Sequence, residues 1–248
     1  MQTFDYCLII AILISGMVIT VKAGKLTMHA ALTGGLLGFA IFAGTGYMGI
    51  AMMATFFILA TIATSWKVNM KSRLGLAEKN KGKRTAGQVI ANAGVPAILG
   101  LMAWLLPLQS KLFLLMIAAC FASATADTLS SELGNVYGRK FYNILTLKKD
   151  TKGLDGVVSF EGTFIGFAGS VIIAVIYAVS EGWDAGIIWI TVAGTAGNLS
   201  DSILGAGLER KNLLNNNAVN FLNTAVAALV ALLLDTFIKT GYILLHNI

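Results

Sequence analysis

Residues 27–65 read TMHAALTGGLLGFAIFAGTGYMGIAMMATFFILATIATS and contain no Lys, Arg, Asp or Glu. A helix that crosses a bilayer needs about 20 predominantly apolar residues, because the hydrocarbon core is about 30 Å thick. The stretch is too long for one such helix and long enough for two. We place the break at the glycine-rich segment 44–49, GTGYMG, and expect two consecutive membrane spans.

Apolar runs recur along the whole chain, which is 56% hydrophobic and only 12% charged. A soluble domain carries about 25% charged residues. Backbone groups in lipid must bond within their own segment, and the alternation of a β-barrel is absent, so the runs are predicted to be helices. The sequence predicts an all-α, polytopic transmembrane helix bundle in which residues 1–248 form a single integral membrane domain. We expect seven or eight spans, the eight being residues 4–21, 27–43, 48–65, 94–108, 111–126, 163–180, 186–199 and 218–237. The span 94–108 is short and bounded by Pro96 and Pro107, so a tilted or re-entrant segment is an alternative there.

The basic residues are distributed unevenly between the two sides of this topology. With eight spans, sixteen of the 18 Lys and Arg residues fall on one side, and only Lys111 and Lys239 fall on the other. The positive-inside rule places the crowded side in the cytoplasm, with three loops at about residues 66–93, 127–162 and 200–217. This distribution explains the net charge of +6 without a nucleic-acid partner. We expect a bacterial or archaeal cell membrane, since the chain has little room for a transit peptide.

Three stripes of polar side chains begin at the cytoplasmic interface and run into the membrane. Each stripe has helical spacing of three or four residues, so its members share one helix face. The stripes are Ser123, Asp127, Ser130, Ser131 and Gly134; then Asn198, Asp201, Ser202 and Gly205; then Asn216, Asn220, Asn223 and Thr224. An ionisable side chain at membrane depth is costly unless it is paired or faces a wet cavity, so Asp127 and Asp201 are functional candidates. The alternative is that the stripes are hydrogen-bonding contacts between packed helices.

Two carboxylates surrounded by hydroxyls and amides fit one cofactor well. Mg²⁺ is usually held by one or two carboxylates together with phosphate oxygens and water. We therefore assign Asp127 and Asp201 as metal ligands, and Asn198, Asn216 and Asn220 as contacts to phosphate or sugar oxygens. A phosphate clamp is expected from the basic, glycine-containing segment of the second loop. Its residues are Lys148, Lys149 and Lys152, with Gly153 and Gly156 beside them, although lysines at an interface also simply face lipid or water.

A further stripe of small residues lies behind the second loop. It comprises Ser159, Gly162, Thr163, Gly166, Gly169 and Ser170, and its plainest interpretation is close helix packing. Glu161 at its start is open to two interpretations, as a site residue or as an interfacial carboxylate. The chain lacks a G-x-x-x-x-G-K-[ST] phosphate loop, and its cysteines and histidines lack metal-ligand spacing.

At these stripes the sequence resembles one membrane family. The matching segments, in order, are 126–134 (ADTLSSELG), 152–163 (KGLDGVVSFEGT), 197–205 (GNLSDSILG) and 216–220 (NNAVN). The family includes plant phytyl-phosphate kinase and animal transmembrane protein 19, and is more distantly similar to CTP-dependent dolichol and phytol kinases and to CDP-diacylglycerol synthases. The resemblance implies an isoprenoid lipid monophosphate as acceptor, a nucleoside triphosphate, CTP in particular, as donor, and Mg²⁺ as cofactor.

On this resemblance the candidate catalytic residues are Asp127, Asp201 and Glu132. The candidate substrate- and nucleotide-binding residues are Ser131, Lys148, Lys149, Lys152, Gly156, Ser159, Glu161, Gly162, Thr163, Asn198, Ser202, Asn216 and Asn220. A phosphate acceptor is already anionic near neutral pH, so no strong general base is required. A lipid-alcohol kinase or cytidylyltransferase using the same site, a transporter and a non-catalytic scaffold remain as alternatives. Membrane lipid is the expected surrounding partner, and self-association into a homo-oligomer is left open.

Overall fold

The computed structural model describes residues 3–77 and 79–246, with the side chains of residues 79, 81 and 238–246 outside that description. The predicted outward lysine Lys239 is among those side chains. The elements in chain order are α1 (Thr3–Lys22), α2 (Met28–Ser65), α3 (Val68–Arg73), η1 (Lys79–Gly82), α4 (Ala86–Leu105), η2 (Pro107–Gln109), α5 (Ser110–Tyr137), β1 (Tyr142–Asn143), β2 (Val157–Val158), α6 (Phe160–Glu181), α7 (Gly186–Leu204), η3 (Gly205–Glu209) and α8 (Asn216–His246). Seven of the described helical stretches are long and apolar enough to cross a membrane, which confirms the all-α polytopic prediction.

The helix α2 is two membrane spans folded back on each other. Gly46 has φ 63° and ψ −150°, which no helical residue adopts. A Cβ atom added at Gly38 would lie 2.9 Å from Cε of Met53, although 15 residues of straight helix would separate these positions by about 22 Å. The rings of Phe42 and Tyr47, on either side of the turn, have centroids 5.1 Å apart. The break predicted at residues 44–49 is confirmed, and the described chain makes eight crossings.

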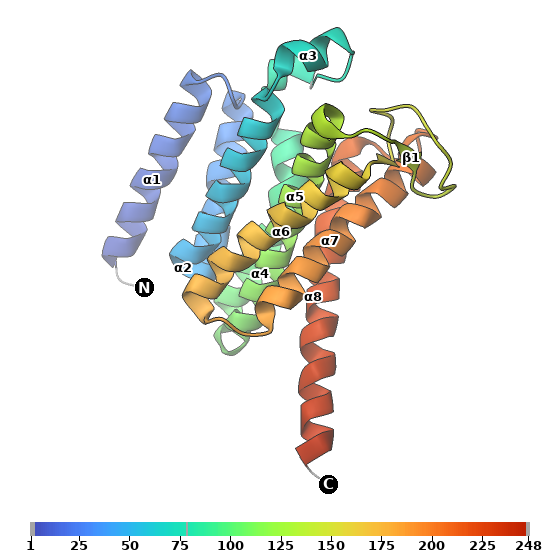
Figure 1. Cartoon of the computed structure of the whole chain (residues 1–248). Coiled ribbons are helices and arrows are strands. Elements are labelled where there is room, and N and C mark those ends of the chain that lie inside the picture. Colours follow the sequence, from blue (N-terminus) through green and yellow to red (C-terminus); the bar gives the residue numbers. More distant parts are fainter. Residues whose placement is uncertain (1–2, 78, 247–248) are drawn as a thin grey trace.

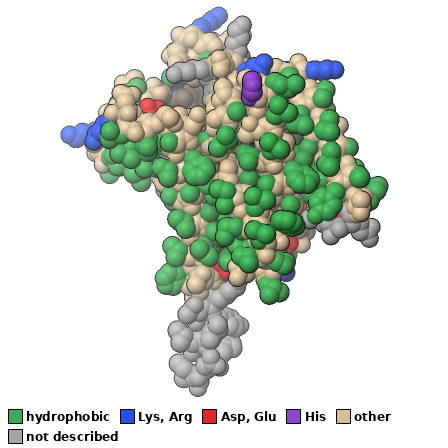
Figure 2. All heavy atoms as spheres, turned by 180° about the vertical axis from the view of Figure 1, so that it is seen from behind, with side chains coloured by type: hydrophobic (Ala, Val, Ile, Leu, Met, Phe, Trp, Pro, Cys, Tyr) green, Lys and Arg blue, Asp and Glu red, His purple; other side chains and the backbone are tan. Residues whose placement is uncertain are grey.

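The longer connections between helices gather at one end of the bundle. Figure 1 shows α3, β1 and the segment after α7 together at the upper end, while both chain termini lie at the lower end. Figure 2 shows Lys and Arg side chains at this upper end and hydrophobic side chains over the flank below it. The fold therefore has one polar, loop-bearing end, called the loop end below, and an apolar belt.

Two of the predicted loops are shorter than expected because their helices extend further. Helix α4 begins at Ala86, where Thr85 and Gln88 form a reciprocal capping box, and it continues through Pro96 to Leu105. The predicted span 94–108 is therefore a full 20-residue helix and not a re-entrant segment. Helix α5 continues to Tyr137, so the whole of the first polar stripe lies on one helix.

Helix α5 forms the centre of the bundle and is buried along most of its length. Small residues let its neighbours approach its backbone. A Cβ atom added at Gly162 of α6 would lie 2.8 Å from the Ser130 carbonyl oxygen, and one added at Gly194 of α7 would lie 2.6 Å from the Ala122 Cβ. The close-packing interpretation of the small-residue stripe at 159–170 is thus confirmed, and α5, α6 and α7 are fixed closely around the first two polar stripes.

Candidate functional site

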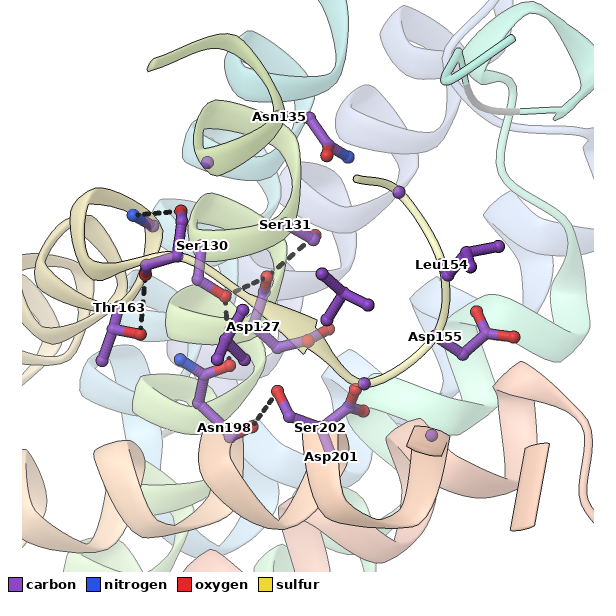
Figure 3. Close-up of a pocket in the computed structure, with 18 of the residues that line it drawn as sticks. Asp127, Ser130, Ser131, Asn135, Leu154, Asp155, Thr163, Asn198, Asp201 and Ser202 are labelled. Atoms are coloured by element: carbon purple, nitrogen blue, oxygen red, sulfur yellow. Dashed lines mark hydrogen bonds between the residues drawn. The ribbon is translucent and has the colours of Figure 1, made fainter. Parts of the chain in front are cut away.

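A polar pocket opens at the loop end of the bundle, between α5, α6, α7, the start of α8 and the loop that joins α5 to α6. Its cavity volume is about 170 Å³. Ten of the residues predicted for the site line it, namely Asp127, Ser131, Gly156, Ser159, Gly162, Thr163, Asn198, Asp201, Ser202 and Asn216. Figure 3 labels six of these, Asp127, Ser131, Thr163, Asn198, Asp201 and Ser202, which come from α5, α6 and α7.

Asp127 on α5 and Asp201 on α7 face each other across the pocket. Their carboxyl groups lie within hydrogen-bonding reach of each other. Asn223 of α8 donates from Nδ2 to Oδ2 of Asp201 at 2.8 Å and so fixes its orientation. Two carboxylates this close cannot both carry an uncompensated charge, so a shared proton or a cation must lie between them.

Hydroxyl and amide groups connect the three polar stripes. Ser130 Oγ donates to Asn198 Oδ1 at 3.1 Å, which joins α5 to α7. Ser123 Oγ donates to Asn223 Oδ1 at 3.2 Å, which joins α5 to α8. Together with the bond from Asn223 to Asp201, these contacts confirm that the three stripes converge on one place.

The loop between α5 and α6 covers one side of the pocket and is fitted closely to the end of α7. Gly156 has φ +68°, and a Cβ atom there would lie 2.4 Å from the backbone nitrogen of Ala206, so only glycine fits. Arg210 donates from Nη1 to Asp150 Oδ2 at 2.8 Å and from Nε to the Asp155 carbonyl. The hydrogen bond from the Thr151 N–H lowers the pKa of Asp150 most, and the hydrogen bond from Arg210 lowers it further, so this carboxylate stays ionised.

The pocket is acidic. Four carboxylate side chains line it, those of Asp127, Asp155, Asp201 and Glu209, and no Lys or Arg is among its described lining residues. A phosphate group that enters the negative electrostatic field of these four carboxylates needs cations to accompany it. The repulsion would otherwise oppose binding.

The donor set fits Mg²⁺ bound together with phosphate. Within residues 3–77 and 79–246, no group of three His, Cys, Asp or Glu side chains is arranged to hold a metal ion by itself. A pair of carboxylates completed by phosphate oxygens and water is, however, the usual environment of Mg²⁺. Asn220, another predicted binding residue, does not line the pocket, and its Oδ1 atom is buried without a hydrogen-bond partner in the described chain, which leaves an acceptor available to water.

Glu132 points away from the pocket, although it was a candidate catalytic residue. It forms a buried ion pair with Lys71 of α3, whose ammonium also donates to the carbonyls of Ala63 and Thr64. Five residues separate Asp127 from Glu132, which is a rotation of about 140° around a helix with 3.6 residues per turn. Glu132 therefore anchors the first loop to α5.

The three lysines of the predicted phosphate clamp do not line the pocket, although Gly153 and Gly156 beside them do. Lys148 and Lys149 are exposed on the turn after β1, where the Asn143 side chain accepts from the backbone N–H groups of Leu145 and Thr146. Lys152 lies over the ring of Phe141, with its Nζ 5.5 Å from the centroid. Glu161 contacts Arg139 at the surface, with 3.9 Å between Oε1 and Nε.

Some lining residues were not anticipated from the sequence. They are Asn135, Phe141, Leu154, Asp155, Val157, Val158, Leu199 and Glu209. Asn135 is eight residues beyond Asp127, two turns along the same face of α5, and could have been found by helical spacing. Asp155 and Glu209 lie outside regular α-helix, where no periodicity predicts the direction of a side chain.

Residues 10–228 match the family described as Integral membrane protein DUF92. The chain is similar to the chloroplastic protein VTE6 of Arabidopsis thaliana, with 32% identity over 84% of this chain and 65% of VTE6. It is also similar to an uncharacterized membrane protein of Synechocystis sp., with 33% identity over 79% of this chain and 78% of that protein. Protein PGR of Arabidopsis thaliana is 24% identical over 94% of this chain and 98% of PGR. No solved structure matches the chain.

The chain thus spans somewhat less than two thirds of the length of VTE6 but most of its Synechocystis relative. The match over 10–228 covers six of the eight crossings in full, the first and the last in part, and all residues that line the acidic pocket. The resemblance seen in the sequence motifs is confirmed: the chain belongs to the DUF92 family of integral membrane proteins.

Proposed function

We propose that the protein transfers the terminal phosphoryl group of a nucleoside triphosphate to an isoprenoid lipid monophosphate, with Mg²⁺ as cofactor. The observation that carries the proposal is the acidic pocket, with Asp127 facing Asp201, at the end of membrane-spanning helices. The motifs that resemble phytyl-phosphate kinase contribute residues to this pocket. Its position near the membrane boundary suits an acceptor whose tail lies in lipid and whose phosphate reaches polar side chains.

In the proposed reaction an oxygen of the lipid monophosphate attacks the γ-phosphorus of the donor. The bond between the γ-phosphorus and the bridging oxygen to the β-phosphate breaks, giving a lipid diphosphate and a nucleoside diphosphate. Phosphoryl transfer of this kind depends mainly on positioning and charge neutralisation. Mg²⁺ held by Asp127 and Asp201 would supply the neutralising charge.

The other polar groups of the pocket position the reactants. Asn198 and Asn216 present amides toward the cavity, and Ser202 adds a hydroxyl. The acceptor oxygen is already anionic, so the site needs no base to remove a proton. This is consistent with a described pocket lining that contains no His.

We also propose that the loop end faces the cytoplasm. The excess of Lys and Arg at this end supports that orientation, and nucleoside triphosphates are supplied from that compartment.

The test is an assay of purified protein with γ-labelled CTP or ATP, Mg²⁺, and phytyl or geranylgeranyl monophosphate. The expected product is labelled lipid diphosphate, with CTP as the better donor and no product from free phytol. Release of pyrophosphate with formation of a cytidylyl lipid would instead identify a cytidylyltransferase. Absence of transfer from either nucleotide to either monophosphate would refute the proposal.

A further inference from the structure

A second cavity lies on the other side of the bundle, between α1, α2 and α4, with a volume of about 220 Å³. Its walls are almost entirely apolar and include Leu13, Met17, Ile50, Met53, Phe57 and Val89. Gly16, Gly34 and Gly35 also line it. A Cβ atom added at Gly16 would have nothing within 4 Å, so the space beside α1 is open. We call this cavity the α1 groove.

Two cations stand at the loop end of the α1 groove. The Thr27 N–H donates to the Arg84 carbonyl at 3.0 Å, and the Arg84 N–H donates to the Lys25 carbonyl at 2.9 Å. This short parallel pairing brings together two basic residues that are far apart in the sequence. It places them where the chain enters α2 and α4, at the loop end of the bundle (Figure 1).

The Arg84 side chain connects the apolar groove to a polar recess. Its guanidinium lies 5.4 Å from the ring centroid of Phe56 and 5.6 Å from that of Phe57, which holds it at the groove wall. The same residue lines a neighbouring recess with Lys25, Thr61, Thr64 and Ser65. Lys25 Nζ donates to Ser65 Oγ at 3.0 Å. An apolar channel therefore ends in two cations and several hydroxyls.

This arrangement complements a molecule with one apolar tail and a small anionic head. The groove is a single slot, with α1 as one wall and α2 and α4 as the other, and α1 buries only Ile9 against the rest of the described protein. A phosphate monoester at the loop end would meet Arg84 and Lys25 directly. Charge-assisted hydrogen bonds from such groups are the strong ones.

We propose that the α1 groove binds a single-chain lipid monophosphate, with its tail between α1 and α2 and its phosphate at Arg84 and Lys25. The inference rests on the proposed function in one respect, since it identifies this lipid with the acceptor. The groove would capture the acceptor from the bilayer at a place separate from the acidic pocket. Binding at the groove requires no metal, because protein cations meet the phosphate there.

The test is binding of geranylgeranyl monophosphate to the full chain in detergent, followed by native mass spectrometry, with EDTA and without nucleotide. Under these conditions the acidic pocket repels phosphate, so the α1 groove is measured alone. Arg84→Gln is expected to raise the Kd about tenfold or more, because a charge-assisted contact is lost. Gly16→Leu is expected to weaken binding by filling the groove. The matched controls, Arg73→Gln on the exposed side of α3 and Ile14→Phe on the lipid side of α1, should bind as the wild type does.

Geranylgeraniol, which lacks the phosphate, and dioleoyl phosphatidic acid, which has two chains, should both bind at least tenfold more weakly. Equal binding of phosphatidic acid would overturn the single-chain assignment. Wild-type affinity in both Arg84→Gln and Gly16→Leu would overturn the site itself. Because neither Mg²⁺ nor turnover enters the measurement, a failed kinase assay leaves this result standing, and the reverse also holds.

Discussion

The acidic pocket and the α1 groove open at the same end of the bundle but differ in charge and in packing. The pocket has four carboxylates, no Lys or Arg among its described lining residues, and walls formed by glycine-lined helices in close contact. The groove has apolar walls, two cations at its rim and a loosely packed outer helix. A phosphate meets protein charge directly at the groove but requires an added cation in the pocket. On the two proposals above, the same ligand group would be recognised by two opposite electrostatic arrangements.

The largest effect is expected at the ion pair between Lys71 and Glu132, which ties the first loop to α5 between the two cavities. The Lys71 and Glu132 side chains are only 1% and 11% exposed. Glu132→Gln leaves a buried ammonium without its counter-charge and should lower the free energy of unfolding by about 3–5 kcal/mol. Chemical unfolding in mixed micelles measures this.

The double variant Lys71→Met with Glu132→Gln should recover most of the lost stability, since neither charge remains. Recovery of stability together with normal turnover would establish Glu132 as a structural residue. If Glu132 instead contacts substrate, the double variant would be stable and inactive.

The next largest effect concerns the pocket carboxylates. Asp127→Asn or Asp201→Asn removes one negative charge but retains shape and hydrogen-bonding capacity. Either change should reduce turnover about a hundredfold or more, equivalent to about 2.7 kcal/mol of transition-state stabilisation. Lipid-diphosphate formation over a range of Mg²⁺ concentrations measures it.

The matched control is Asp5→Asn at the opposite end of the bundle, where the aspartate accepts a hydrogen bond from Tyr47. It should leave turnover unchanged. Binding of lipid monophosphate in EDTA should also survive both pocket substitutions. Near-normal turnover of both pocket variants would show that the aspartates only join helices.

A smaller effect is expected where the loop meets α7. Gly156→Ala places a Cβ atom 2.4 Å from the Ala206 nitrogen, whereas Gly75→Ala has a similar φ of +69° and nothing within 4 Å. Both variants carry left-handed strain of about 1–2 kcal/mol. Only Gly156→Ala adds overpacking, about 1–3 kcal/mol more, and should also reduce turnover. Equal stability of the two variants would show that the loop is not fitted to α7.

The smallest effect is expected from cysteine labelling, which tests whether the loop end is one face. Single cysteines replacing Lys149, Arg73 and Lys111 should leave turnover unchanged, since none lines either cavity. The first two should react with an impermeant maleimide from the same side, and the third from the other. Labelling of Lys149→Cys and Arg73→Cys from opposite sides would show that the loop end is not a single face of the membrane.

Periodic features of the sequence predicted most of the fold and part of the site. Run length and the GTGYMG break located the eight crossings. Helical spacing placed Asn198 and Asp201 on one helix face and Asp127 on another, and the common interface at which the stripes begin indicated that they meet. What escaped prediction depends on contacts between distant segments. The pairing of Lys25 with Arg84 arises from two irregular backbones, and the position of Asp155 depends on a loop shaped by left-handed glycines.

The sequence also placed lysines of the second loop in the pocket, while the structure turns Lys148 and Lys149 to the surface. A run of charged residues indicates a segment that contacts solvent or headgroups. The direction in which its side chains point depends on the conformation of the turn that carries them. Here that turn is the one closed by the Asn143 side chain.

The hydrogen bonds from Arg210 to Asp150 and Asp155 restrict how the pocket can open. The Arg210 guanidinium binds residues on both sides of the turn at Gly153, which lines the pocket. Arg210 itself directly follows Glu209, another lining residue. The loop and the segment after α7 are therefore joined to each other, and a motion that lifts the loop alone would break both contacts. If a nucleotide binds in the pocket as proposed, we expect its exchange to involve movement of the opposite wall, at the end of α5, and not of this loop alone.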